Sequence, residues 1–324
     1  MAAAAGIKGL FHAFLSAIQR DDLNQHRPNG WNGYCSSRAA LMKLIWSINP
    51  LERDPNLLKR STSAIGILNS QGDWMIQPFV LISQFSFLPF QAPCPSTPGD
   101  TASRITDAVQ KRVFDLTRGC DLKGLQSAHV ILRRYHPLRP EVSELLDYAR
   151  SEKADLILTA TRARKGWRRW LSGSFSESLI YHSEIPVLFL NPGCGPDVRF
   201  DRIVFPTEIS SDFEDTLPRV IRLARKLKSE VVLFIRPMGQ DVSAKRIEKW
   251  TEMAKETQVT LRFRTHTKGD FVESVLKYAT ESADLIAYCE RSRQEDYWRL
   301  ERETRRLVRN APCPVLVFYP EKTA

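Results

Sequence analysis

The chain has 324 residues, 43% of them apolar, and a formal net charge of +10 at pH 7. This length predicts two domains, and no apolar run approaches the roughly 18 to 20 residues that a membrane-spanning helix needs. The six cysteines show no C-x-x-C pair and no paired spacing with histidine, which argues against a disulfide framework or a zinc site. We therefore expect reduced thiols, no metal and a cytoplasmic protein without membrane contact.

Residues 1–41 differ from everything that follows. A short helical stripe, Leu10 to Ile18, gives way to a polar segment rich in Asn, Gly and Pro. The stripe lacks the pattern of a secretory signal. Strand-like sequence begins just after Met42, so we expect residues 1–41 to be a disordered extension or an over-extended start of a protein that begins at Met42.

Apolar runs and helical patterns alternate from Met42 to residue 192. Because parallel neighbours need crossover connections, strands separated by helices predict an open parallel five-stranded sheet with helices on both faces. The strands are predicted at 43–48, 76–82, 128–133, 155–159 and 187–190, and the helices at 57–68, 100–118, 141–151 and 174–182. A Gly/Pro-rich linker is predicted at 193–199.

The same pattern restarts after the linker. Ala154-Asp155-Leu156-Ile157 leads to Pro186-Val187-Leu188-Phe189, and Ala283-Asp284-Leu285-Ile286 leads to Pro314-Val315-Leu316-Val317. A repeat spacing of about 130 residues suits a duplicated whole domain. We predict two tandem α/β domains at 42–192 and 200–324. Strands of the second are expected at 203–205, 231–235, 260–264, 285–288 and 315–318, and helices at 213–227, 244–256, 271–280 and 298–309.

The loop at 159–174 is the candidate ligand site of the first half. In an open parallel sheet, ligands bind beyond the carboxyl ends of the strands, where the strand order reverses. This loop follows an apolar strand and ends at the start of a helix. There Gly173 lets the backbone approach a phosphate, and Ser174 can cap the helix and donate to an anion.

The segment from Ala154 to Leu190 resembles the universal stress protein family, whose nucleotide-binding members carry a G-x2-G-x9-G-[S/T] loop between the fourth strand and fourth helix. The resemblance extends over both halves from Met42 and implies a tandem member. The first two glycines of the motif fall on Ala160 and Ala163, while the third glycine and its hydroxyl partner remain as Gly173 and Ser174. The acidic residue that ends the first strand falls on Asn49, which can hydrogen-bond but carries no charge.

This resemblance implies a stress-response regulatory protein that binds ATP or another adenine nucleotide in the first half only. It places Asn49 and Leu81 near the base, and Thr159, Ala160, Ala163, Gly173, Ser174, Phe175 and Ser176 along the loop and at the phosphates. The second half has Glu301 and Arg302 at the Gly-Ser position and no glycine from 289 to 302. No nucleotide is therefore expected there, although Glu208 stands where the first-strand acid is expected.

A second interpretation stays open for the basic stretch 162–170, which interleaves five Arg and Lys residues with Trp167 and Trp170. The chain would then be an interaction or scaffold protein without a nucleotide, whose loop meets an acidic partner or, less readily, a nucleic acid. Neither interpretation predicts an enzyme. His129, His136, His182 and His266 have no Ser or Cys partner at motif spacing, and the resemblance implies at most very slow ATP hydrolysis.

The resemblance also bears on assembly. In the family the final strand often lies at a dimer interface, and here Val187 to Phe189 and Val315 to Val317 are the final strands. We therefore expect the two halves to pair as an intramolecular pseudo-dimer. A homodimer of the whole chain is left open.

Overall fold

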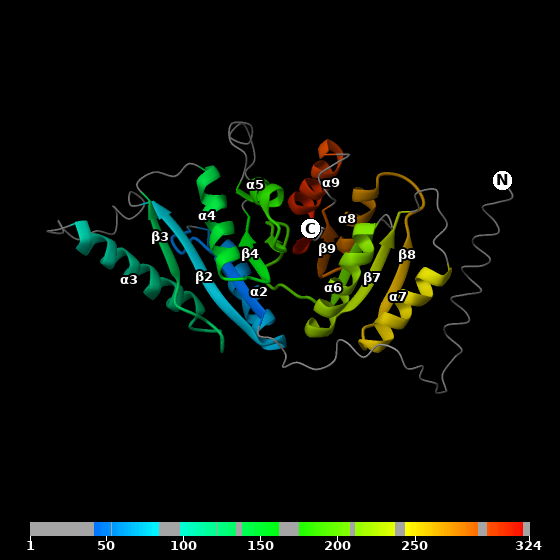
Figure 1. Cartoon of the computed structure of the whole chain (residues 1–324), viewed down its shortest axis with the longest axis horizontal. Helices are drawn as coiled ribbons and strands as arrows, with labels where there is room; N and C mark the ends of the chain where they lie inside the picture. The colour runs from blue at the N-terminus through cyan, green and yellow to red at the C-terminus, as the bar shows by residue number, and fades with distance from the viewer. Residues whose placement is uncertain are drawn as a thin grey trace. The chain divides into compact units, whose positions relative to one another are not determined.

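Ten strands of this chain form one sheet in the order β3-β2-β1-β4-β5-β10-β9-β6-β7-β8 (Figure 1). The structure is a computed structural model that describes residues 42–52, 54–83, 98–120, 122–133, 138–161, 175–207, 211–236, 244–290 and 297–319. Residues 41–324 form one unit, whereas the predicted extension at 1–41 lies outside the described residues.

Each half contributes five parallel strands. The first half has β1 (Met42–Ser47), β2 (Trp74–Ser83), β3 (His129–Arg133), β4 (Leu156–Ala160) and β5 (Val187–Leu190). The second has β6 (Arg202–Thr207), β7 (Glu230–Ile235), β8 (Leu261–Thr265), β9 (Leu285–Cys289) and β10 (Val315–Phe318). The strand order of the second half is that of the first in reverse. The predicted α/β class with five parallel strands in each half is therefore confirmed, but the two sets of strands join in one ten-stranded sheet instead of forming two.

Helices cover both faces of the sheet because its strands are apolar on both sides. Neighbouring residues of a strand point to opposite faces, and Leu44 and Ile45 accordingly enter two different buried clusters. One cluster contains residues of α2 (Pro55–Gln71), α3 (Pro98–Thr117), α6 (Ser211–Leu227) and α7 (Ala244–Glu256). The other contains residues of α4 (Leu138–Ser151), α5 (Phe175–His182), α8 (Phe271–Ser282) and α9 (Tyr297–Asn310).

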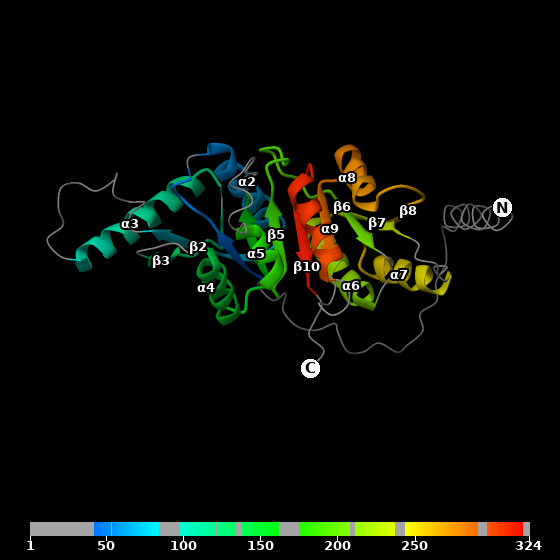
Figure 2. The same cartoon turned by 90° about the horizontal axis from the view of Figure 1, so that it is seen from above.

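The two halves meet at β5 and β10, which lie side by side in Figure 2. These strands pair antiparallel, with Val187 opposite Val317 and Phe189 opposite Val315. Since every other pairing is parallel, the strands of the two halves run in opposite directions. Their carboxyl ends therefore lie at opposite edges of the shared sheet.

The chain crosses between the halves through a tightly packed segment. Asn191 is fully buried; its Nδ2 donates to the Cys313 carbonyl at 3.0 Å and its Oδ1 accepts from the Gly193 backbone N–H at 2.8 Å. Arg60 donates to the Asn191 carbonyl at 3.0 Å. A Cβ on Gly193 would lie 2.4 Å from the Ala311 carbonyl oxygen, so a larger residue cannot fit. The segment predicted as a linker is thus anchored to both halves where it begins.

Both halves repeat one side-chain arrangement at the outer strands. An aromatic residue of the second strand and a tyrosine of the following helix contact a side chain of the edge strand. In the first half the His129 ring stacks on the rings of Tyr148 and Phe79, with centroid distances of 4.0 Å and 5.8 Å. In the second, the guanidinium of Arg264 lies 4.5 Å from the Tyr278 ring centroid and 6.0 Å from that of Phe234. This correspondence fixes which residues of the two halves are equivalent.

Within the described ranges, every helix is too short or too polar to cross a membrane.

Candidate functional site

The carboxyl edge of the first half brings several predicted site residues together. The strand order reverses between β1 and β4, the position where open sheets bind ligands. Ser47 pairs with both Phe79 and Thr159. Asn49 lies two residues after Ser47, Leu81 lies two residues after Phe79, and Ala160 directly follows Thr159. The three therefore lie at adjoining positions of one edge.

The predicted site residues that the structure describes at this edge are uncharged. Asn49 is exposed, and its Oδ1 accepts a hydrogen bond from the Leu51 backbone N–H at 3.0 Å, which closes a tight turn after β1. Thr159 is buried and Ala160 is half-buried. Leu81 and Phe175, the first residue of α5, are half-buried and pack against the same apolar cluster.

Part of the predicted site lies outside the described residues. This applies to Ala163, Gly173 and Ser174, and to the basic stretch 162–170. The last of the predicted site residues, Ser176, is half-buried in the first turn of α5. The structure thus joins the β1, β2 and β4 positions and the start of α5 at one edge.

The second half has an ion pair at the equivalent edge. The pairing of Pro206 with Phe234 repeats that of Ser47 with Phe79, which makes Arg236 the equivalent of Leu81. Glu303 on α9 is the equivalent of Phe175 by the sequence repeat. Arg236 Nη2 lies 3.0 Å from Glu303 Oε1, and both side chains are 15% exposed. The second half therefore has an ion pair where the first half has two apolar side chains.

A further carboxyl group continues this polar network. The hydroxyl of Tyr288 donates to Glu303 Oε2 at 3.3 Å, and the hydroxyl of Thr304 donates to Glu290 Oε2. Burial raises the pKa of Glu290 to about 7, the negative charge of Glu303 adds to the rise, and the Thr304 hydrogen bond opposes it. Burial also raises the pKa of Tyr288 well above its ordinary value. Burial therefore brings the pKa of Glu290 into the neutral range.

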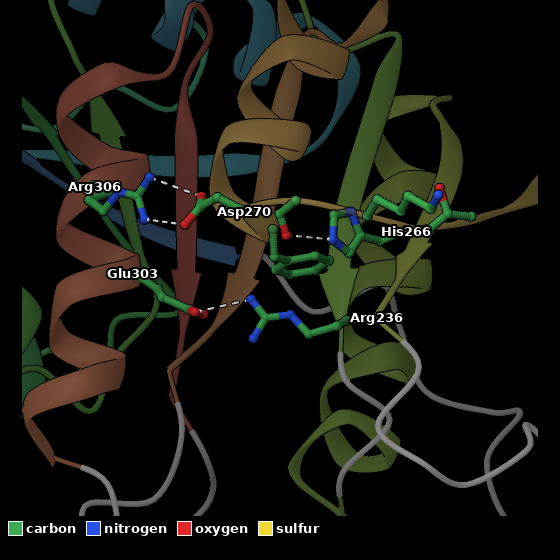
Figure 3. A pocket seen from close by; sticks show the side chains of 9 residues that line it. Arg236, His266, Asp270, Glu303 and Arg306 are labelled. Carbon is green, nitrogen blue, oxygen red and sulfur yellow. Dashed lines mark hydrogen bonds and ion pairs between the residues drawn. The ribbon is translucent and has the colours of Figure 1, made fainter.

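An open cleft of about 570 Å³ lies beside this network, past the carboxyl ends of β7 and β8 (Figure 3). Arg306 holds Asp270 through two N–H···O bonds of 2.9 Å each. The Asp270 carboxylate also accepts from the Glu273 backbone N–H at 2.8 Å and so caps α8. The Arg306 bonds, with help from the Glu273 N–H, lower the pKa of Asp270. The lining residues are Arg236, His266, Thr267, Lys268, Gly269, Asp270, Phe271, Glu303 and Arg306.

Comparisons with known proteins bear on the fold and on the first half. Residues 96–191 match the model of the Universal stress protein family. A universal stress protein from Archaeoglobus fulgidus DSM 4304 aligns at 17% identity over 86% of this chain and 98% of its own, with a TM-score of 0.60. A functionally unknown protein from Pseudomonas aeruginosa PAO1 aligns at 12% identity over 87% of this chain and 94% of its own, with a TM-score of 0.52. A search of curated proteins gives no match.

These findings support a relationship to the universal stress protein family. The matched residues include the whole of the loop at 159–174 and the helix α5 that follows it. They end at Asn191, where the chain leaves the first half. At identities this low, the structural likeness shows the fold alone.

Sequence reasoning missed the cleft of the second half. Its residues come from the end of β7, the β8–α8 loop and α9, and no local motif unites them. The one local signal was Lys268-Gly269-Asp270 before an amphipathic stretch, because aspartate is a preferred helix cap. Among the described residues no group of three or more His, Cys, Asp or Glu side chains is placed to hold a metal ion.

Proposed function

We propose that this protein is a regulatory protein of the universal stress type that binds ATP or another adenine nucleotide at the carboxyl edge of its first half. It acts by binding rather than by turnover, and the second half takes no nucleotide at the equivalent edge. The family match to residues 96–191 supports this assignment, since those residues contain Gly173 and Ser174 of the phosphate loop.

The contrast between the two edges carries the proposal. A purine ring needs an apolar surface, which Leu81 and Phe175 supply from β2 and α5 in the first half. In the second half the same two positions hold the Arg236–Glu303 ion pair. Separating this half-buried ion pair would leave both charges without a partner at a cost of about 2–3 kcal/mol, which a nucleotide would have to overcome before it gained any contact.

The phosphates are assigned to the start of α5 and to the loop before it. The N-terminus of a helix attracts anions through its unpaired N–H groups and its dipole. The five cations between Arg162 and Arg169 add charge that offsets the glycines lost at Ala160 and Ala163. The second half then acts as the structural partner of the first, as the β5–β10 pairing supports, and each chain takes up one nucleotide.

Calorimetric titration with Mg-ATP tests this proposal. We expect one nucleotide per chain, and we expect Leu81→Arg, which introduces the second-half residue, to raise the Kd at least tenfold. Gly173→Asp should have the same effect by placing a negative charge at the phosphates. Ser70→Arg, an exposed position on α2, adds the same charge away from this edge and should leave the Kd unchanged.

The contrary result is equally clear. If the wild type gives no heat with Mg-ATP and native mass spectrometry shows no bound nucleotide, the proposal is wrong. The basic stretch 162–170 would then be the place to look for an acidic partner, and pull-down with and without its arginines replaced would follow.

A further inference from the structure

The cleft of the second half has the size of a small-molecule site. Its volume of about 570 Å³ falls within the roughly 300–1,000 Å³ of ligand pockets. The loop beside the cleft turns at Gly269, whose φ of +89° is one that other residues rarely adopt. A Cβ built there would meet no atom within 4 Å, so the space beside the loop is open.

The charges around the cleft favour an anion. Three permanent cations line it, namely Arg236, Lys268 and Arg306, against the two carboxylates of Asp270 and Glu303. Each carboxylate already has an arginine partner. Lys268 has no ion pair with any residue in the described ranges, so it supplies the excess positive charge.

The helix terminus does not serve as the anion site here. Asp270 occupies the start of α8, where its carboxylate accepts from the Glu273 N–H. An anion must therefore bind the side chains around the cleft. Arg306 has five N–H donors, of which its two bonds to Asp270 use two.

One wall of the cleft is aromatic. The rings of His266 and Phe271 meet edge to face with centroids 5.5 Å apart, and the guanidinium of Arg236 lies 4.0 Å from the Phe271 centroid. The Nε2–H of His266 donates to the Gly269 carbonyl at 3.1 Å, which fixes the orientation of the imidazole ring. Phe271 is only 5% exposed and Arg236 covers its ring, so the half-buried ring of His266 is the part of this wall that a flat unsaturated group can contact.

We propose that this cleft binds a small aromatic phosphomonoester, at a site separate from the nucleotide site of the first half. A phosphomonoester carries a charge of about −1.5 to −2 and three acceptor oxygens, which suits cations that approach from different elements. A carboxylate ligand carries only one negative charge, and Arg236 and Arg306 are already paired with the carboxylates of Glu303 and Asp270. Phosphate is therefore the chemistry that the cleft selects.

Titration of the full chain with phenyl phosphate tests the site, with binding followed by calorimetry. We expect saturable binding of one molecule per chain and a Kd at least tenfold higher in Lys268→Glu. Lys255→Glu is the matched control, since Lys255 is exposed on α7 outside the cleft. Its Kd should equal that of the wild type. Thermal unfolding should confirm that both variants fold, as neither lysine belongs to an ion pair of the described residues.

Three results would overturn the proposal. The first is no saturable binding of phenyl phosphate, and the second is equal weakening by both lysine variants, which would indicate only a general effect of charge. The third is benzoate binding as tightly as phenyl phosphate, since we expect it to bind at least tenfold more weakly. Leu81→Arg separates the two sites: phenyl phosphate should still bind it, and a loss there would place the phosphate in the first half and contradict the assignment.

Discussion

Glu290 should make the stability of this protein depend on pH near neutrality. Its side chain is half-buried at the end of β9, where burial raises the pKa from an ordinary 4.5 to about 7. The folded state therefore holds this proton more tightly than the unfolded state. The resulting stabilisation is complete below pH 4.5 and is lost as the pH rises through about 7.

The size of the effect follows from the two pKa values. One pH unit between them corresponds to about 1.4 kcal/mol, so the interval from 4.5 to about 7 corresponds to about 3 kcal/mol. Glu290→Gln keeps the shape of the side chain and an acceptor oxygen for the Thr304 hydroxyl, but it cannot ionise. We expect this variant to match the wild type at pH 4.5 and to be more stable by up to about 3 kcal/mol at pH 8.

Urea unfolding from pH 4.5 to 8 measures this difference. Other titrating groups, including His129, contribute equally to both proteins and cancel when the two curves are subtracted. Glu248→Gln, at an exposed position of α7, is the control and should follow the wild type at every pH. If the curves of Glu290→Gln and the wild type run parallel, the reasoning about the buried carboxyl is refuted.

Three further predictions concern single contacts. Arg236→Leu should lower the free energy of unfolding by about 2–3 kcal/mol, because it leaves Glu303 as a partly buried charge without its arginine. Adding Glu303→Phe should recover most of this loss, as a double-mutant cycle in urea would show. Simple addition of the two single-mutant losses would contradict the prediction. Asn191→Ala should cost about 2–4 kcal/mol, since it removes the buried bond to the Cys313 carbonyl and the bonds within the crossing segment; an unchanged urea midpoint would contradict this. Burial lowers the pKa of His129, so its contribution to stability is full above the ordinary histidine pKa of 6.5 and is lost as the pH falls. The difference between the melting temperatures at pH 5 and pH 7.5 should therefore be smaller for His129→Phe than for the wild type.

The two edges also show how two similar halves can carry different side chains at equivalent positions. The backbone pairing at Phe79 and Phe234 is the same in both halves, so the equivalent side chains occupy equivalent positions. A leucine at one position and an arginine at the other then give the two edges different chemistry. The sheet sets the position, and the side chain sets the chemistry.

Much of the fold follows from the sequence because strands and helices depend on local patterns. The strand β4 reads as an apolar run interrupted only by Thr159, since it is buried on both faces, as parallel strands are. The helix α2 begins where Asp54 accepts from the Asn56 N–H and proline follows. The repeat of Ala-Asp-Leu-Ile then predicted two similar halves.

The candidate site was only partly predictable. Asn49, Leu81 and Ala160 could be placed at one edge because the carboxyl ends of parallel strands must lie together. Whether they bind a nucleotide stays a prediction. The Arg236–Glu303 pair gave no sequence signal, since neither residue belongs to a motif, and the cleft gave only the aspartate cap at Asp270.

What the sequence by itself determined is therefore the set of strands, helices and caps, which depend on residues a few positions apart. Only the tertiary structure decided that β5 pairs with β10 and that Arg236 meets Glu303, 67 residues further along the chain. Such contacts depend on the order and register of strands distant in sequence. An arginine and a glutamate are ordinary surface residues until the sheet brings them to one edge and buries them together.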